Sequence, residues 1–494
     1  MQITVTRKNI RFSPDPARVI GRFCNYSKER SKKIILNVLD MSDSEVYTVL
    51  SQVLRGYSRR HRNISQILES HFAKLNGIFN ELGIKPLKIN QSRRTLIGSY
   101  FTMEYSIESA AFFNPSVVED PDQSETGTDE KRLIFSFRAT GEGHISSIVF
   151  RSAVIDRNNN LIIEPVGKML AEAARIKRHI YNKKSFMKKL DEMHDFDNSL
   201  SPLFVLEKLA ERFTYGELKR AVEEIRKSHQ LTPNKELIIN QMMWLALSHY
   251  EIEFSLDSAI SERVIFPISD SEKNGIEDAR FVKFTEDSGK VIYYATYTAY
   301  DGMFILPKLL STRDFYHFKG LPIHGELAQN KGMALFPRKI NGKYAILCRT
   351  DGVNNYLAYS DNISIWREAK LIQKPKYSWE LIQVGNSGSP IETDAGWLVI
   401  THGVGPMREY VLGASLYELN NPENEIGRLK TPLISPNSEE REGYVPNVVY
   451  SCGSIIHNGN LIVPYAMSDY ASTYATIDLN ELLNELKNSE KISS

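Results

Sequence analysis

Seven short clusters of polar residues could carry out chemistry in this chain. Each combines glycine or proline with charged or amide side chains, and each lies beside a segment rich in strand-forming residues. Together they supply carboxylates, guanidinium groups and imidazoles, a chemistry that suits the binding of a sugar and an anion. The clusters lie at residues 114–116, 138–144, 275–280, 331–338, 385–390, 402–408 and 440–447.

Several well-known catalytic motifs are absent from the sequence. It contains no GxxxxGK[ST] phosphate loop, no HExxH zinc motif, no GxSxG and no GxGxxG after a strand. The histidines are scattered, and Cys24, Cys348 and Cys452 form neither a CxxC pair nor a disulfide framework. We therefore predict no metal site and no cofactor.

The clusters need a scaffold, and a loose repeat indicates which one. A strand is followed by Ser or Thr, then by an acidic residue and often an aromatic one, at intervals of about 50 to 60 residues except between the first two copies. Repeated β units of this kind predict a mainly β fold, a five-bladed β-propeller whose loops converge on a central channel. The five copies lie at residues 152–156, 312–315, 360–366, 415–418 and 476–478.

Two further regions have helical patterns. Ser42 and Glu45 form a capping box ahead of an apolar helical face. The stretch 175–189 is basic and amphipathic, which is typical of a helix with a solvated cationic face or, alternatively, of a partner or subunit surface. The predicted parts are an N-terminal mixed and helical extension (1–100), the first part of the propeller (101–164), a helical insertion between blades 1 and 2 (165–252), the rest of the propeller (253–485) and a tail (486–494).

Composition limits the partners. The formal net charge is +1, from 61 basic and 60 acidic residues, so no global field attracts nucleic acid or an anionic membrane. No apolar run approaches the roughly 20 residues of a spanning helix, and the first residues lack the apolar stretch of a secretory signal. We predict a cytoplasmic protein with no nucleic-acid or membrane partner, and a possible homo-oligomer through the helical segments.

Several ordered segments resemble glycoside hydrolase family 130, which comprises β-mannoside phosphorylases and β-1,2-mannosidases. The signature is Gly275-Ile276-Glu277-Asp278-Ala279-Arg280, followed by Tyr297-Thr298-Ala299-Tyr300-Asp301-Gly302. Other matching segments are 113–115, 138–144, Lys331 with 334–337, 396–398 with 402–404, and 443–449. Ala279 stands where many members have proline, which changes local stiffness and not chemistry. The resemblance implies a five-bladed β-propeller.

The resemblance also implies roles for individual residues. Asp278 is expected to be the catalytic acid, which in the family's phosphorylases is thought to protonate the departing oxygen through the mannosyl 3-hydroxyl. Alternatives are that Asp278 and Arg280 form a structural ion pair, that Arg138 holds a neighbouring loop, and that Asp301 makes a turn with Gly302. The expected substrate-binding residues are Asn114, Arg138, Glu277, Arg280, Asp301 and Asp469.

The second reactant separates a phosphorylase from a hydrolase. Phosphate needs fixed cations and donors, and matching segments offer Lys331, Arg349, His402, Arg408 and Tyr410. A hydrolase needs a carboxylate base about 6.5–9.5 Å from the acid, for which the candidates are Glu380, Glu440 and Glu442.

Because the cations are retained, we favour inverting phosphorolysis of a β-mannosidic bond, with β-1,2 as the expected linkage. The substrates would be a mannose-containing oligosaccharide and inorganic phosphate, and the product α-mannose 1-phosphate. An inverting β-1,2-mannosidase is the alternative, and a non-catalytic sugar-binding propeller is the third reading.

Overall fold

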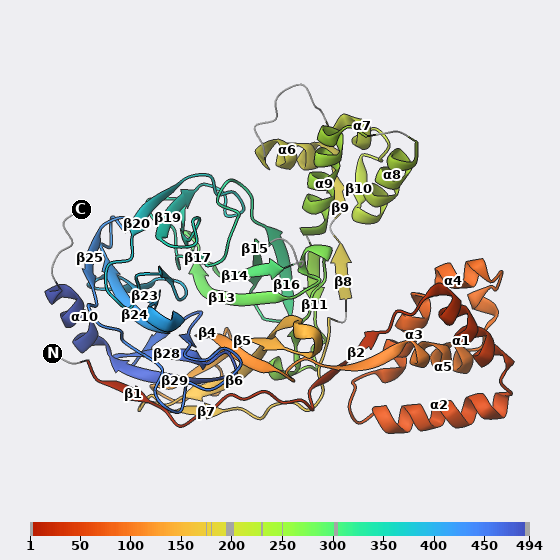
Figure 1. The fold of residues 1–494 in the computed structure, drawn as a ribbon, viewed down its shortest axis with the longest axis horizontal. Helices are drawn as coiled ribbons and strands as arrows, with labels where there is room; N and C mark the ends of the chain where they lie inside the picture. Colours follow the sequence, from red (N-terminus) through yellow and green to blue (C-terminus); the bar gives the residue numbers. More distant parts are fainter. Residues whose placement is uncertain are drawn as a thin grey trace.

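The computed structural model describes residues 3–173, 175–178, 180–193, 202–228, 231–248, 250–300 and 305–489. These residues form a body of antiparallel β-sheets, a helical bundle near the N-terminus and a helical lobe inserted between two strands of the body (Figure 1). Among the described helices, none is both long and apolar enough to cross a membrane.

Five sheets of four or more strands make up the body, and we number them in chain order. The first contains β4 (Ala111–Glu119), β5 (Lys131–Thr140) and β6 (Ser146–Ile155), with β7 (Leu161–Ile163) and β12 (Val264–Ile265) on β6. The second runs β13 (Ile276–Thr285), β14 (Val291–Tyr300), β15 (Ile305–Thr312), β16 (His317–Pro322), β11 (Tyr250–Glu253), β8 (Arg175–Arg178). The third runs β17 (Ala334–Leu335), β18 (Tyr344–Cys348), β19 (Asn355–Ser360), β20 (Ala369–Gln373).

The last two sheets have the same antiparallel pattern. The fourth runs β21 (Gln383–Asn386), β23 (Gly396–Val404), β24 (Tyr410–Tyr417), β25 (Glu425–Arg428), with β22 (Ile391–Thr393) on β23. The fifth runs β26 (Val449–Tyr450), β28 (Asn460–Met467), β29 (Ala471–Asp478), β1 (Val5–Arg7), with β27 (Ile455–His457) on β28. The helix α10 (Leu479–Asn488) follows β29 and packs against the fourth sheet.

Each sheet contacts the next, and the last contacts the first. β4 contacts β13, β14 contacts β17, β18 contacts β21, β24 contacts β26, and β28 contacts β4. Aromatic side chains fill the spaces between neighbours: the rings of Phe150 and Phe281 are 5.9 Å apart between the first and second sheets, and those of Phe336 and Trp397 are 5.0 Å apart between the third and fourth. The five sheets therefore form a closed circuit (Figure 1).

The loose sequence repeat marks one position in every sheet. Its five copies end β6, β15, β19, β24 and β29, which are each the third strand of their sheet. The polar residues make the turn or cap that follows the strand: the Asp156 carboxylate accepts the backbone N–H of Asn158 at 2.8 Å, and the Ser360 hydroxyl accepts that of Asn362 at 3.1 Å, whereas Asp478 caps α10. The repeat is thus local turn chemistry at equivalent places.

The stretch 1–100 divides between two parts of the structure. β1 pairs with β29 and completes the fifth sheet, whereas the helical bundle begins only at Lys28. The predicted capping box of Ser42 and Glu45 is confirmed at the start of the second helix. The bundle contains α1 (Lys28–Asp40), α2 (Asp43–Tyr57), α3 (Ile64–Ala73), α4 (Asn76–Glu81) and α5 (Gln91–Tyr100), and the ribbon of β2 (Val19–Phe23) with β3 (Thr102–Ser106) joins it to the body.

The inserted lobe contains strands as well as helices. The prediction of a helix across 175–189 is wrong for the first half of that stretch. There β8 pairs with β11, and β9 (Ile180–Asn182) pairs with β10 (Arg212–Thr214). The helix α6 begins only at Lys183. The distant pairing partners override the local helical pattern. The lobe's helices are α6 (Lys183–Met193), α7 (Leu203–Leu206), α8 (Tyr215–Ser228) and α9 (Pro233–Ser248). Short 3₁₀ turns are η1 (Pro86–Lys88), η2 (Glu142–His144), η3 (Ile260–Glu262), η4 (Asp270–Glu272) and η5 (Pro406–Arg408).

Candidate active site

The first strands of the first two sheets carry the same irregularity. The β4–β5 register shifts between Phe113 and Ser116, and the β13–β14 register shifts between Glu277 and Arg280. Inside these bulges Asn114 has φ 51° and Asp278 has φ 54°, a left-handed conformation that costs a non-glycine residue free energy. The bulges turn the two side chains toward each other, and the Asn114 amide donates to Asp278 Oδ1 at 2.6 Å.

Two cations and a second carboxylate surround this pair. Arg138 of β5 donates to Glu277 Oε1 at 2.6 Å, and Lys331, just before β17, donates to Glu277 Oε2 at 2.6 Å. A guanidinium nitrogen of Arg138 also lies 3.7 Å from Asp278 Oδ1. Asp278 is 8% exposed. The predicted residues Asn114, Arg138, Glu277, Asp278 and Lys331 are thus brought together from three sheets.

The two aspartates of the site, Asp278 buried and Asp469 half-buried, have opposite pKa shifts. Burial alone would raise the pKa of Asp278, but the charges of Arg138, Lys331 and Arg280 and the Asn114 hydrogen bond hold it below its usual value. Burial, together with the neighbouring Asp278 carboxylate, raises the pKa of Asp469 to about 6. Two carboxyl groups with diverging pKa values at one place are typical of a catalytic site.

A pair of arginines, Arg280 buried and Arg349 half-buried, lies beside the carboxylates. Arg280 donates to the Tyr450 hydroxyl at 2.8 Å, and Arg349 lies 3.1 Å from His402 Nε2. Burial lowers the pKa of Arg349, and the charge of Arg280 lowers it further. The two guanidinium groups are therefore close enough to interact electrostatically. The Nε atoms of both arginines are buried without a hydrogen-bond partner among the described residues. Two cations with neutral partners and unused donors form a site for an anion.

His402 is fixed as a neutral imidazole. Its Nδ1 lies 3.1 Å from the Asn386 carbonyl oxygen, so Nδ1 donates and Nε2 accepts from Arg349. Burial and the two arginine charges hold its pKa well below the usual value. The Tyr410 ring stacks on His402 with centroids 6.3 Å apart. Tyr450 was not among the predicted site residues, although it directly follows the matching segment 443–449.

Every sheet contributes to this cluster. Asn114 and Arg138 come from the first sheet, Glu277, Asp278 and Arg280 from the second, Lys331 and Arg349 from the ends of third-sheet strands, His402 and Tyr410 from the fourth, and Tyr450 and Asp469 from the fifth. The site therefore lies where the five sheets meet. Arg408, in η5, is exposed and acts on Asp469 through its charge. Asp301 lies outside the described residues.

Comparison with known proteins agrees with this geometry. A family model for glycoside hydrolase family 130, described as β-1,4-mannooligosaccharide phosphorylase, matches residues 239–488, a little more than half of the chain. The 1,2-β-oligomannan phosphorylase of Thermoanaerobacter sp. (strain X514) is 34% identical over 221 residues, which are 43% of this chain and 72% of that protein. The chain belongs to glycoside hydrolase family 130.

Two Listeria innocua matches extend the comparison. The β-1,2-mannobiose phosphorylase of L. innocua serovar 6a is 28% identical over 243 residues, 47% of this chain and 65% of that protein, slightly under two thirds of its length. The solved structure of a β-1,2-mannobiose phosphorylase from L. innocua in complex with β-1,2-mannobiose has 22% identity and a TM-score of 0.45, over 76% of this chain and 92% of that one. As a family 130 member, the chain is an enzyme of the phosphorylase and glycosidase type.

The side chains of the three candidate glutamate bases of this family 130 enzyme make no hydrogen bond or ion pair with the cluster residues in the part of the chain that the structure describes. Glu380 is fully buried in the fourth sheet, where Oε1 accepts from Arg428 at 2.9 Å and Oε2 has no partner among the described residues. Glu440 accepts the Tyr465 hydroxyl at 2.6 Å inside the fifth sheet. Glu442 is exposed in the loop before β26. Nothing in the residue types or the spacing of these three glutamates in the sequence indicates that their surroundings differ.

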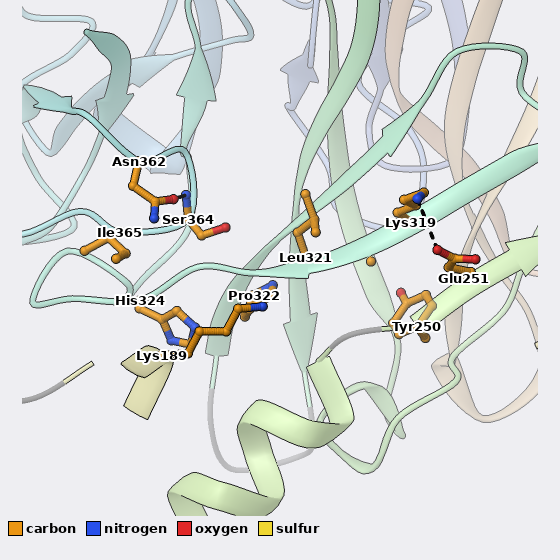
Figure 2. Close-up of a pocket in the computed structure, with 11 residues that line it drawn as sticks. Lys189, Tyr250, Glu251, Lys319, Leu321, Pro322, His324, Asn362, Ser364 and Ile365 are labelled. Carbon is orange, nitrogen blue, oxygen red and sulfur yellow. Dashed lines mark hydrogen bonds and ion pairs between the residues drawn. The ribbon is translucent and has the colours of Figure 1, made fainter. Parts of the chain in front are cut away.

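Three cavities are described elsewhere in the family 130 chain, and the cluster residues line none of them. One of about 380 Å³ lies between β16 and the lobe, where Lys189, His324 and Asn362 line it (Figure 2). Another of about 700 Å³ lies between the bundle and the body. No group of three or more His, Cys, Asp or Glu side chains with metal-binding geometry occurs in the part of the chain that the structure describes.

Proposed function

We propose that this family 130 enzyme cleaves a β-mannosidic bond by phosphorolysis and releases α-mannose 1-phosphate with inversion. The observation that carries the proposal is the arginine pair: Arg280 is buried and Arg349 half-buried, both have neutral partners, and both keep a buried Nε donor unused. Inorganic phosphate has the charge and the acceptor oxygens that these groups lack. We further infer that the five sheets are the blades of a five-bladed β-propeller, because they close into a circuit.

Phosphate binding would also prepare the acid. Asp278 is held ionised by Arg138, Lys331 and Arg280, a state in which it cannot donate a proton. A phosphate anion at Arg280 and Arg349 offsets part of this positive field, so the pKa of Asp278 rises toward the range of an acid catalyst. The proton then passes to the departing oxygen, by way of the mannosyl 3-hydroxyl in the scheme that the family resemblance implies. Phosphate attacks the opposite face of the sugar, which inverts the anomeric centre.

Hydrolysis is the weaker alternative. It needs a carboxylate base facing Asp278 with space for a water, and Glu380 and Glu440 are instead bound to Arg428 and Tyr465. The β-1,2 linkage is supported by relatives that are named for β-1,2-mannobiose or 1,2-β-oligomannan. The third reading, a sugar-binding propeller without activity, gives no reason for a buried anion site beside the acid.

Incubation with β-1,2-mannobiose in the presence and absence of inorganic phosphate tests the proposal. We expect α-mannose 1-phosphate, detected by ³¹P NMR, only when phosphate is present. Equal release of mannose without phosphate would make the enzyme a hydrolase, and binding without turnover would make it a sugar-binding protein. β-1,4-mannobiose, assayed in parallel, tests the linkage.

A further inference from the structure

A buried polar network lies under the turn that leads into the catalytic strand. Glu272, the last residue of η4, has a side chain that is 1% exposed. Its Oε1 accepts from Lys308 Nζ at 2.9 Å and from the Tyr297 hydroxyl at 2.8 Å. Its Oε2 accepts the backbone N–H groups of residues 268 and 269 at 2.9 and 3.0 Å. Each carboxylate oxygen therefore has at least two donors, and none of these groups belongs to the site described above.

The inserted lobe is joined to this network by β11, the strand of the second sheet that directly follows the lobe's last helix, α9. Tyr250 of β11 places its hydroxyl 3.0 Å from the Tyr297 hydroxyl and 3.4 Å from Glu272 Oε1. Its ring lies against Gly320 of β16 so closely that a Cβ there would be 2.6 Å from the ring. Figure 2 shows Tyr250 at the edge of the cavity beside the lobe. The residue thus connects the strand that follows the lobe, and the cavity that the lobe's Lys189 also lines, to the carboxylate under the turn.

The turn that contains Glu272 and Gly275 also determines the position of the site residues. Gly275 donates its N–H to the Glu272 carbonyl oxygen at 2.7 Å, and its φ of 130° suits glycine. A Cβ at Gly275 would be 2.8 Å from the Ser146 nitrogen, so the two backbones are in direct contact. The Ser146 hydroxyl accepts from Arg138 at 2.8 Å. The position of the turn therefore affects Arg138 as well as Asp278, which follows three residues after Gly275.

Stability alone does not account for such a network. A buried ion pair seldom stabilises a fold more than apolar side chains of the same size, whereas a fully satisfied buried network rigidifies the backbone around it. We propose that Glu272, with Lys308 and Tyr297, is a positioning residue that fixes residues 268–278 and so the catalytic carboxylate, and that Tyr250 couples the helical lobe to this position. The effect on catalysis rests on the proposed role of Asp278.

The test combines hydrogen exchange with kinetics. The double variant Glu272→Gln/Lys308→Met removes both buried charges together and leaves no unpaired ion. We expect amide exchange in the peptide covering 268–280 to be about tenfold faster or more, kcat to fall about 10- to 100-fold, and KM for phosphate to change less than about threefold. Tyr250→Phe removes one hydroxyl. It should also speed amide exchange in 268–280 and lower kcat, but by smaller factors.

Glu119→Gln is the matched control. Glu119 accepts from Lys283 at 2.7 Å, so it holds the other end of the same strand, β13, by an ion pair. This variant should leave exchange in 268–280 and kcat unchanged. Unchanged exchange in the double variant would overturn the proposal whether or not the enzyme is a phosphorylase, because exchange does not depend on activity. Faster exchange with an unchanged kcat in the double variant would overturn the positioning role. Wild-type exchange and kcat in Tyr250→Phe would overturn the coupling to the lobe.

Discussion

The raised pKa of Asp469 means that its ionised carboxylate lowers the free energy of unfolding by a measurable amount. The residue lies in the turn between β28 and β29 with φ 50°. Burial, together with the Asp278 carboxylate, raises its pKa from 3.8 to about 6, against the charges of Arg138 and Lys331. Asp469→Asn keeps the shape of the side chain and removes the charge. We therefore expect the variant to be more stable than the wild type at neutral and alkaline pH.

The magnitude and its sign follow from linkage. A group with a higher pKa in the folded state binds more protons there, so it costs nothing below pH 3.8, and its cost grows as the pH rises toward 6 and is complete above that value. A difference of about two pH units corresponds to about 3 kcal/mol. Because Asp469 keeps some contact with solvent, we expect a gain of about 2 kcal/mol for Asp469→Asn at pH 8, and a smaller gain at pH 5.

Urea unfolding followed by tryptophan fluorescence at pH 5 and pH 8 measures this difference. Asp351→Asn is the matched control with the opposite sign. Desolvation raises the pKa of the exposed Asp351 carboxylate, but hydrogen bonds from Val353, Asn354 and Tyr356 hold it at about 2. The carboxylate therefore stabilises the fold above pH 3.8, and that stability is lost as the pH falls toward 2. A wild type more stable than Asp469→Asn at pH 8, or a gain of equal size at both pH values, would refute the reasoning. On the sugar-binding role that the family resemblance implies for Asp469, we expect kcat/KM of Asp469→Asn to fall about 10- to 100-fold, because a charged hydrogen bond would be lost.

Three further substitutions separate chemistry from structure. Asp278→Asn should lower kcat by at least about 1000-fold in the phosphorolysis assay while the protein still unfolds cooperatively; retention of a tenth of the activity would exclude Asp278 as the acid. Arg349→Met should raise KM for phosphate about 10- to 100-fold and KM for the mannoside far less; equal rises would show that Arg349 is not specific to phosphate. Glu380→Gln should lower the free energy of unfolding by about 2 to 3 kcal/mol, because Arg428 loses one of its buried charge partners, with kcat unchanged; a large fall in kcat would restore Glu380 as a base candidate.

The parts of the fold that could be predicted from sequence are those set by local chemistry. The repeat at the ends of five strands is visible because a hydroxyl or carboxylate that starts a turn acts over two or three residues, as Asp156 and Ser360 do. The capping box of Ser42 and Glu45 is local in the same sense. The site residues around Asp278 were predicted through motifs, whose order along the chain survives folding.

The parts that could not be predicted depend on pairing between distant segments. β1 has only three residues, and nothing in them indicates a partner more than 460 residues later. Strand β8 has a helical pattern, yet its pairing with β11 decides its conformation. The candidate bases show the same limit, because the sequence cannot tell that Arg428 lies next to Glu380.

In the proposed reaction, the distribution of charge in the site favours phosphate over water as the second reactant. Arg138 and Lys331 share the carboxylate of Glu277 and also act on Asp278. Arg280 and Arg349 have no carboxylate of their own at hydrogen-bond distance among the described residues, so their positive charge is offset only at longer range by Asp278. A neutral water molecule would leave that charge as it is, whereas phosphate neutralises it and releases Asp278 to take up its proton. The same field that keeps the acid ionised in the free enzyme thus makes protonation depend on the second substrate.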